Sequence, residues 1–344
     1  MSERIVLVTG GAGYVGSHAC KALAGAGYLP VTYDNLVRGH ADAVRWGPLE
    51  MGDMLDGDRI AEVIATHRPL AVMHFAAASE VGESVADPIK YYRNNVQGTL
   101  TLLDAMRHGG VDAIVFSSTC AVYGLPQSCT LSEDHPHRPT SPYGASKSMV
   151  EQLLRDCCAA HGLRAMALRY FNAAGADADG EVGEDHDPET HLIPRAIHAA
   201  LGEGPSLTIM GTDYDTPDGT CVRDYIHVTD LAAAHVAALE RTIGGSGFDA
   251  CNLGTGRGYS VREIVKAVER NAGIPVPAAT GARRPGDPPN LVADPTRARE
   301  VLKWEPRHSG LDNIIATALA WARSDTMHRR KAARGEAAES AASG

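Results

Sequence analysis

The chain has 344 residues, a formal net charge of -10 at pH 7 and 44% hydrophobic residues. This length predicts one large domain or two, and the negative charge argues against a general affinity for nucleic acid or anionic membranes, so neither is expected as a partner. The first apolar run, Ile5–Val8, follows no signal-like segment, and no later run is long enough to span a membrane, so we expect a cytoplasmic protein. Seven cysteines without a C-x-x-C pair predict reduced thiols and no zinc site.

Short apolar runs alternate with segments of helical periodicity in the first half of the chain. Each run has the length of a buried strand, and each intervening segment is long enough for a helix. This alternation predicts an α/β fold, a Rossmann-type, doubly wound parallel sheet with helices on both faces. The expected strands are residues 5–9, 29–33, 71–74, 113–116 and 164–168.

A glycine-rich turn, Gly11-x-Gly13-x-x-Gly16, lies between the first expected strand and a helix. Backbone N–H groups and the helix dipole can hold a pyrophosphate there. Asp34 closes the second expected strand, where a carboxylate accepts hydrogen bonds from a ribose 2′-OH and repels a 2′-phosphate. The motif therefore predicts NAD rather than NADP; the alternative is a glycine-rich turn with an unrelated aspartate. Asp53, at the end of a third expected strand, is predicted to lie near the adenine.

Tyr143 and Lys147 are four residues apart, so on a helix they share one face and the ammonium can lie beside the phenol. A free tyrosine has a pKa of about 10. It acts as a base at neutral pH only if its surroundings favour the phenolate by about 3 pKa units, or roughly 4 kcal/mol. Lys147 and the positively charged nicotinamide ring could supply this help. The alternative is a surface helix that carries an unrelated Tyr and Lys.

The character of the chain changes in its second half. The segment Asp177–Glu189 is acidic and interrupted by glycine, and shorter expected elements and long loops follow. We therefore predict an NAD-binding domain at residues 1–176, a smaller α/β substrate-binding domain at residues 177–326 and a polar, disordered tail at residues 327–344. His186 could suggest a metal site in the acidic segment, but solvated loop charges explain the segment better, and no metal is predicted.

Together these motifs resemble the extended short-chain dehydrogenase/reductases and, more narrowly, the UDP-glucose 4-epimerases. The resemblance runs from about Arg4 to Trp304. The broad family is indicated by Gly10–Gly16, His74–Ala78, Tyr91–Thr99, Phe116–Thr119 and Tyr143-x-x-x-Lys147. The narrower group is indicated by Val81–Ser84, Leu168–Asn172, Asp218–Val228 and Arg283–Asp287.

The resemblance implies an isomerase that interconverts UDP-glucose and UDP-galactose through a transient 4-keto sugar, with NAD as a reversible hydride carrier. It makes Tyr143 the base that takes the proton of the sugar 4′-OH, Lys147 its electrostatic partner, and Thr119 a hydroxyl that hydrogen-bonds the 4′-oxygen. The implied NAD-binding residues are Gly10, Gly13, Tyr14, Val15, Gly16, Asp34, Asn35, Asp53, Met54, Phe75, Ala76, Ala77, Asn95, Ser117, Tyr143, Lys147 and Tyr170. The implied substrate-binding residues are Ser79, Thr119, Tyr143, Asn172, His191, Leu192, Thr208, Met210, Arg223, Arg284, Asp287 and Leu291.

The chain differs from related enzymes at two positions, and these differences reduce the number of reactions that it could catalyse. Sugar-nucleotide 4,6-dehydratases follow the catalytic Ser or Thr with Asp-Glu, and decarboxylating relatives place Glu at the position of Ala121; here Cys120 and Ala121 stand there. This leaves a reaction that needs a base, a hydroxyl and a hydride carrier. One alternative is a UDP-xylose/UDP-arabinose 4-epimerase with the same machinery. Another is a non-catalytic NAD-sensing regulator, although such proteins typically lose the Tyr or Lys that this chain retains.

The resemblance also implies a homodimer and a limit on substrate size. The dimer would form through helices at residues 95–106 and 143–159, the alternative being ordinary packing against the sheet. Leu291 stands where hexose-restricted members often carry Tyr, so we expect main activity on non-acetylated sugars and slight activity on UDP-GlcNAc. Some relatives carry Asn at the position of His191, so whether His191 contacts the substrate stays open. The apolar positions expected at the dimer are Val96, Leu100, Leu103, Val150, Leu153 and Leu154.

Overall fold

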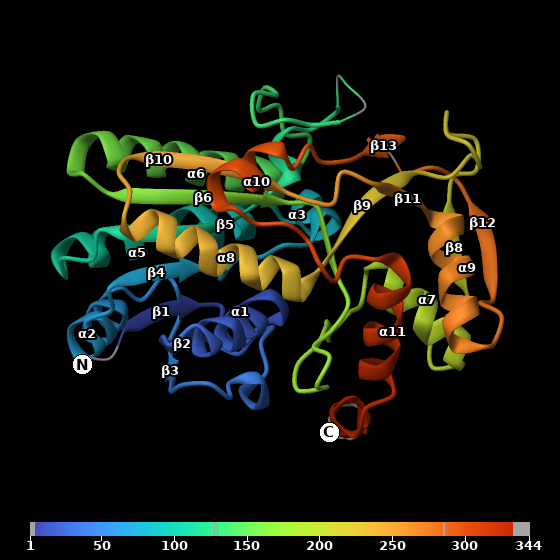
Figure 1. Ribbon diagram of the computed structural model, residues 1–344, viewed down its shortest axis with the longest axis horizontal. Helices are drawn as coiled ribbons and strands as arrows, with labels where there is room; N and C mark the ends of the chain where they lie inside the picture. The colour runs from blue at the N-terminus through green and yellow to red at the C-terminus, as the bar shows by residue number, and fades with distance from the viewer. Residues whose placement is uncertain (1–3, 127, 129, 285, 333–344) are drawn as a thin grey trace.

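The computed structural model describes residues 4–126, 128, 130–284 and 286–332. Its largest element is a parallel seven-stranded sheet in the order β3-β2-β1-β4-β5-β6-β10 (Figure 1). The order reverses beside β1, which is the arrangement of a dinucleotide-binding sheet and confirms the predicted Rossmann-type fold. The strands are β1 (Ile5–Thr9), β2 (Leu29–Asp34), β3 (Leu49–Met51), β4 (Ala71–His74), β5 (Ala113–Thr119), β6 (Arg164–Tyr170) and β10 (Phe248–Leu253).

Helices cover both faces of this sheet. One face carries α1 (Tyr14–Gly25) and α8 (Val228–Ile243), and the other carries α2 (Gly57–His67), α5 (Gly98–His108) and α6 (Pro142–His161). Each face buries its own apolar cluster, which is why the strands read as continuous apolar runs in the sequence. Among the described residues, no helix is both long and apolar enough to cross a membrane.

A smaller α/β unit lies at one end of the large sheet (Figure 1). Strand β9 (Val222–His227) pairs with three short strands, β7 (Asn172–Ala174), β11 (Gly258–Ser260) and β13 (Asn290–Leu291). A second small sheet pairs β8 (Leu207–Met210) with β12 (Ala278–Gly281). Three helices pack around an apolar cluster of their own: α7 (Leu192–Leu201), α9 (Val261–Ala272) and α11 (Leu311–Ala322).

The second half of the chain also contributes to the large sheet. The predicted domain boundary between residues 176 and 177 had assigned all of these residues to the smaller domain or the tail. β10 pairs with β6 over its full length, α8 packs on α1, and α10 (Thr296–Leu302) contributes Leu302 to the same core. The predicted boundary therefore does not divide the chain into two consecutive units. The apolar pattern of a returning strand is the same whichever sheet it joins, so the sequence pattern alone did not reveal the return.

The prediction of a disordered tail that starts at residue 327 is wrong for residues 327–332, which are helical. Met327 is buried with Trp321 and Ala176, and Arg330 forms ion pairs with Asp42 and Asp185. This polar segment is ordered because Arg330 forms ion pairs with residues that are distant in the sequence. Residues 333–344 lie outside the described residues.

A buried ion pair fastens α6 to the large sheet. Arg169 on β6 donates from Nη2 to Glu151 Oε2 at 2.6 Å and from Nε to Glu151 Oε1 at 2.9 Å, and both side chains are at most 2% exposed. Ser118 on β5 donates to the same carboxylate at 2.6 Å. Burial disfavours ionised Glu151, but the charge and hydrogen bonds of Arg169 outweigh this and hold its pKa below the usual value. α6 is therefore held at a fixed height over β5 and β6.

Removing one member of this pair should destabilise the protein strongly. Glu151→Ala leaves the Arg169 guanidinium buried without its partner, which costs about 3–5 kcal/mol in comparable cases. The double variant Glu151→Leu/Arg169→Met removes both charges and should recover most of the loss. Denaturant unfolding of the three forms measures this. Asp104→Ala, which breaks an ion pair with Arg107 whose side chains are 65% and 55% exposed, is the control and should lower the unfolding free energy by less than about 1 kcal/mol. Equal effects of the two single changes would contradict the account.

Candidate active site

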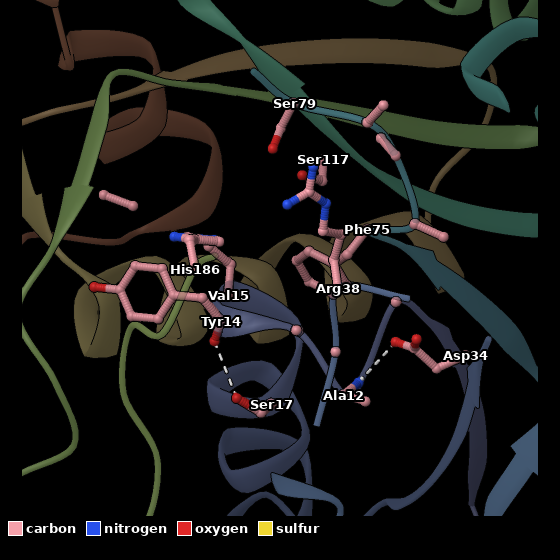
Figure 2. A pocket seen from close by; sticks show the side chains of 18 of the residues that line it. Ala12, Tyr14, Val15, Ser17, Asp34, Arg38, Phe75, Ser79, Ser117 and His186 are labelled. Atoms are coloured by element: carbon pink, nitrogen blue, oxygen red, sulfur yellow. Dashed lines mark hydrogen bonds between the residues drawn. The ribbon is translucent and has the colours of Figure 1, made fainter. Parts of the chain in front are cut away.

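A cavity of about 420 Å³ runs along the edge of the large sheet where the parallel strands end. Its wall combines the glycine-rich turn after β1, the end of β2, the segment after β4 and the ends of β5 and β6 (Figure 2). The loop at residues 182–186 closes another side of it. Ligands of doubly wound sheets bind at this edge, so the cavity is the first candidate for the active site.

The glycine-rich turn can be built only from glycines at two positions. Gly10 has φ +73°, and a Cβ there would lie 2.5 Å from the backbone N of Ala76. A Cβ on Gly16 would lie 2.2 Å from the carbonyl O of Gly10. The turn therefore packs tightly between β4 and the first turn of α1, and the N-terminus of α1 borders the cavity. This is the cradle that a pyrophosphate requires.

Asp34 faces this turn from the end of β2. Its Oδ2 accepts from the backbone N of Ala12 at 3.1 Å (Figure 2), and its Oδ1 accepts from the N of Leu36 at 2.9 Å. Burial raises the pKa of Asp34, and the backbone donors act in the opposite direction. The carboxylate is thus fixed beside the turn, where a ribose 2′-OH could donate to it. The site fits NAD as predicted.

Two predicted cofactor residues lie behind the cavity wall instead of lining it. The Oδ2 of Asp53 accepts from Asn35 Nδ2 at 2.9 Å, while Gly52 and Met54 on either side of Asp53 line the cavity. Asn95 is 2% exposed; its Oδ1 accepts from Ala78 N at 2.8 Å, and its Nδ2 donates to Ala78 O at 3.0 Å. Asn95 therefore holds the segment after β4 in place.

The other predicted residues divide between the cavity and the smaller unit. Those that line the cavity are Gly10, Gly13, Tyr14, Val15, Gly16, Asp34, Asn35, Met54, Phe75, Ala76, Ala77, Ser79, Ser117, Thr119, Tyr143, Lys147, Tyr170, Asn172 and His191. Those that lie outside its lining are Leu192, Thr208, Met210, Arg223, Arg284, Asp287 and Leu291.

Lys147 is the buried cation of the site. Its Nζ donates to the carbonyl O of Ser117 at 2.8 Å and lies 4.7 Å from the centroid of the Phe116 ring. Burial lowers the pKa of Lys147 from 10.5 to about 7, although the charge of Glu151 one turn along α6 opposes this. The ammonium is thus held against β5 at a position where a small change in its surroundings decides its charge.

Tyr143 lies in the first turn of α6, whose N-cap Ser141 accepts from the backbone N of Gly144 at 3.2 Å. The side chain is 9% exposed and lies with Thr119 in the cavity wall. Burial raises the pKa of Tyr143 well above its ordinary value, nearby Tyr170 adds to this, and hydrogen bonding from Thr119 opposes it. The protein by itself keeps this phenol protonated, so any use of it as a base needs additional positive charge.

Cys120 follows Thr119 directly and is 7% exposed. Burial raises the pKa of its thiol to about 12. Neither this thiol nor the methyl group of Ala121 can exchange a proton with a substrate near neutral pH. The position occupied by an acid and a base in 4,6-dehydratases is therefore inert in this chain.

Three of the predicted substrate residues meet in the smaller unit. Arg223 on β9, 9% exposed, forms an ion pair with Asp287, which is 64 positions along the chain. Leu291 on β13 stands opposite Arg223 in the strand register and packs with Phe171 against an apolar cluster. These three residues, which the resemblance alone had assigned to substrate binding, therefore lie close together in the structure.

Several charged residues of the cavity wall were not among the predicted site residues. Arg38 and Glu80 line it, as do Glu184 and Arg330. Arg38 follows the NAD-selecting aspartate closely, and this spacing was an available signal. Arg330 had been assigned to the tail, and no local pattern marks it as part of a site.

Comparisons with known proteins agree with this geometry. The family model "NAD dependent epimerase/dehydratase family" matches residues 6–254. A UDP-glucose 4-epimerase of Rhizobium leguminosarum bv. trifolii is 53% identical over 328 residues, covering 95% of this chain and 100% of the relative. The crystal structure of a UDP-glucose 4-epimerase from Brucella ovis in complex with NAD has a TM-score of 0.90 and 56% identity over 92% of this chain and 98% of that one. The crystal structure of a UDP-glucose 4-epimerase from Stenotrophomonas maltophila with bound NAD and formylated UDP-arabinopyranose has a TM-score of 0.91 and 40% identity. The match covers 95% of this chain and 100% of that one.

The chain belongs to the NAD dependent epimerase/dehydratase family. This membership confirms the predicted family and cofactor. The family description leaves two reactions open, because it includes both epimerases and dehydratases. The buried thiol of Cys120 and the alanine after it favour the first, since a dehydratase needs an acid and a base at that place.

The depressed pKa of Lys147 predicts a pH dependence of stability. The folded protein loses this proton near pH 7 and the unfolded chain near its ordinary value of 10.5. Between these values the unfolded state binds more protons, so the unfolding free energy of the cofactor-free protein rises with pH, by up to about 1.4 kcal/mol per unit. Below about pH 7 this contribution stops changing.

Denaturant unfolding at several pH values between about 7 and 9 measures this slope. Lys147→Met should remove the contribution, so that the difference between the wild type and the variant increases in favour of the wild type as pH rises. Lys90→Met, at a lysine with a 46% exposed side chain, is the control and should retain the wild-type slope. Parallel slopes for the wild type and Lys147→Met would show that Lys147 does not titrate in this window.

Proposed function

We propose that the chain catalyses the interconversion of UDP-glucose and UDP-galactose by inversion at C4 of the sugar, with tightly held NAD. The observation that carries this proposal is the composition of one cavity wall. It joins the pyrophosphate turn and Asp34 to Thr119, Tyr143 and Lys147. A sugar bound between these two groups would have its C4 next to both a hydride acceptor and a base.

When bound, NAD supplies reversible hydride transfer at C4 of the sugar and a positive charge on its oxidised ring. Tyr143 takes the proton of the 4′-OH as the hydride leaves C4, which gives a 4-keto sugar and a neutral phenol. The ketone then turns its other face, the hydride returns, and Tyr143 gives the proton back. Thr119 hydrogen-bonds the 4′-oxygen throughout, and the Lys147 ammonium favours the phenolate. Each group ends the cycle in its starting state.

The smaller unit is proposed to hold the UDP part of the substrate. A diphosphate needs guanidinium or backbone donors, and Arg223 is a nearly buried guanidinium whose present partner is Asp287. Substrate binding would exchange this ion pair for Arg223–phosphate contacts and free Asp287 to accept from a ribose hydroxyl. Asn172 lines the cavity at the start of β7, between the two units. The roles of Arg284, Leu192, Thr208, Met210 and Leu291 remain proposals from the resemblance.

The second candidate is 4-epimerisation of a UDP-pentose, which needs the same groups. It is favoured by the bound formylated UDP-arabinopyranose of the Stenotrophomonas maltophila relative. The pure protein should therefore be assayed on UDP-galactose and UDP-arabinose in parallel. Higher kcat/KM for UDP-galactose is expected, and the reverse order would replace the hexose proposal with the pentose one. Turnover of neither sugar would contradict both. The cytoplasmic location stays a prediction.

A homodimer through the same two helices remains part of the proposal, but fewer of the predicted apolar positions are available to it. Leu103, Val150 and Leu154 are buried against the chain's own sheet, which is the alternative raised for them. Leu100 on α5 and Met149 on α6 are 46% and 48% exposed. Val96 and Leu153, the other two predicted positions, are half-buried. A second copy could cover these partly exposed apolar side chains.

Tyr143→Phe should lower kcat by about 10²- to 10⁴-fold, because a positioned general base typically contributes this much. Affinity for UDP should change little, since the hydroxyl is assigned to the sugar. Initial rates on UDP-galactose and calorimetric titration with UDP measure the two effects. The control is Tyr91→Phe, which removes the hydroxyl of a buried tyrosine whose ring packs on Tyr143 at 6.4 Å between centroids but which does not line the cavity. Equal kcat values for the two variants would remove Tyr143 from the mechanism.

Light scattering should give a mass of twice 36.3 kDa at micromolar protein. Leu100→Glu with Met149→Glu would place charge in the proposed interface and should shift the mass toward the monomer. Leu125→Glu, at a residue that is 55% exposed and lies on neither helix, should leave the mass unchanged. A wild-type monomer, or a dimer that survives both changes, would contradict this interface.

A further inference from the structure

Two histidines and two glutamates meet in the loop that leads from β7 to α7. Glu184, His186, Glu189 and His191 each place one ligand-type atom within 4.8 Å of the other three. His186 lies at the cavity wall beside Tyr14, with their ring centroids 6.2 Å apart (Figure 2). The spacing Glu-x-His-x-x-Glu-x-His delivers all four side chains from eight consecutive residues. We call these four residues the Glu/His cluster.

The expectation that the charges of this segment are solvated is wrong for the carboxylates of the cluster. The side chains of Glu184 and Glu189 are 8% and 12% exposed. Burying two carboxylates side by side is unfavourable unless a cation lies between them. In the described part of the chain neither forms an ion pair with a lysine or an arginine.

A neighbouring group of acidic residues is neutralised by a lysine of the same chain and serves as a comparison. Asp177, Asp179 and Glu181 also gather closely enough to hold a metal ion. Lys21 points into that group, with its Nζ 2.7–2.8 Å from all three carboxylates. That group therefore has its cation, and the Glu/His cluster differs from it in offering imidazole nitrogens in place of an ammonium.

The imidazole of His186 is the second sign of a missing partner. Its Nδ1 is inaccessible to solvent and has no partner in a hydrogen bond of acceptable geometry, although it lies 3.3 Å from Glu184 Oε1 and 3.7 Å from Glu189 Oε2. The nitrogen is thus aimed between the two carboxylates and not along a hydrogen bond to either. A nitrogen that lies near two carboxylates without a hydrogen bond to either is available as a ligand of an ion shared with them.

The distances from the histidine nitrogens to the glutamate oxygens lie on either side of those expected around a four-coordinate ion. His191 Nδ1 lies 2.9 Å from Glu184 Oε1 and forms a hydrogen bond of 3.0 Å with Glu189 Oε1. With the two His186 distances, one of them to the other oxygen of Glu189, the histidine–glutamate distances span 2.9–3.7 Å. Bonds of about 2.0–2.1 Å in a tetrahedral zinc site place neighbouring ligand atoms about 3.3–3.5 Å apart. A His₂Glu₂ donor set suits zinc and similar divalent transition metals.

We propose that the Glu/His cluster is a structural binding site for one divalent transition-metal ion of the zinc class. With four protein ligands the coordination is complete, so the ion would not touch the substrate, and His191 would serve the ion in place of the substrate contact that the resemblance implied for it. It would instead fix the loop that closes the cavity. Trp321 Nε1 already donates to the carbonyl O of Glu184 at 2.9 Å, and His191 is the N-cap residue of α7. The ion would link these two anchors.

Cobalt binding by the full chain without an affinity tag tests the proposal. After treatment with a chelator and exchange into metal-free buffer, Co²⁺ should bind in one equivalent per chain and give the intense visible ligand-field bands of tetrahedral coordination. Zn²⁺ should displace it and raise the midpoint of thermal unfolding. His186→Gln should weaken binding by more than about 100-fold, since the loss of an outer-sphere partner alone typically costs about 10- to 100-fold.

The matched control is His108→Gln. His108 Nδ1 also lies 3.5 Å from a carboxylate oxygen, that of Asp104, but both side chains are 65% exposed. This change should leave the stoichiometry and the bands as in the wild type. Absence of tetrahedral bands in folded wild-type protein would overturn the proposal. It would also fall if Co²⁺ bound equally to His186→Gln, which would mean an adventitious ion at other histidines. In either case the cluster would be a pair of carboxylates neutralised by two imidazolium groups.

Discussion

The docking of α6 against β5 and β6 fixes the geometry on which the rest of the site depends. Two charged residues one helical turn apart, Lys147 and Glu151, are both buried in this contact. Lys147 is tied to the backbone of β5, and Glu151 to Arg169 of β6 and Ser118 of β5. Buried charges with specific partners tolerate little displacement, because each loses its compensation when it moves. The helix therefore cannot slide along the sheet, and Tyr143 at its first turn is held at the edge of the cavity.

The same burial sets the chemical state of the site. Removing Tyr143 and Lys147 from water favours the neutral forms of both, a phenol and an amine. Neutral groups would be of little use as a base and its electrostatic partner. The positively charged ring of oxidised NAD would change this balance, because a nearby positive charge stabilises a phenolate. Tyr143 would therefore act as a base only while the cofactor is oxidised, so that proton removal and hydride removal belong to the same state of the enzyme.

Local motifs predicted much of the fold and of the cofactor site. The glycine spacing, Asp34 and the pair Tyr143/Lys147 carry their meaning within a few residues, and the alternation of apolar runs was enough to predict the parallel sheet. What the sequence did not reveal depends on distant partners. β5 and β6 extend beyond their apolar runs because Ser118 and Arg169 are satisfied by Glu151. β10 returns from the second half of the chain, Arg330 reaches the cavity from a segment whose sequence resembles a disordered tail, and the side chain of Glu184 is only 8% exposed although it lies in an acidic segment. In each case the position of the residue or strand depends on contacts with residues that are distant in sequence, and such contacts leave no local sequence pattern.

The most direct test of this account is the ionisation of Tyr143 in the NAD-loaded protein, followed by the ultraviolet absorbance of tyrosinate against pH. The account predicts that the wild type contains one phenol with an apparent pKa well below the ordinary value of about 10. This phenol should be absent from NAD-loaded Tyr143→Phe, and its pKa should rise when the cofactor is reduced. Identical titrations of the wild type and the variant would contradict the claim that cofactor charge makes this buried tyrosine a base.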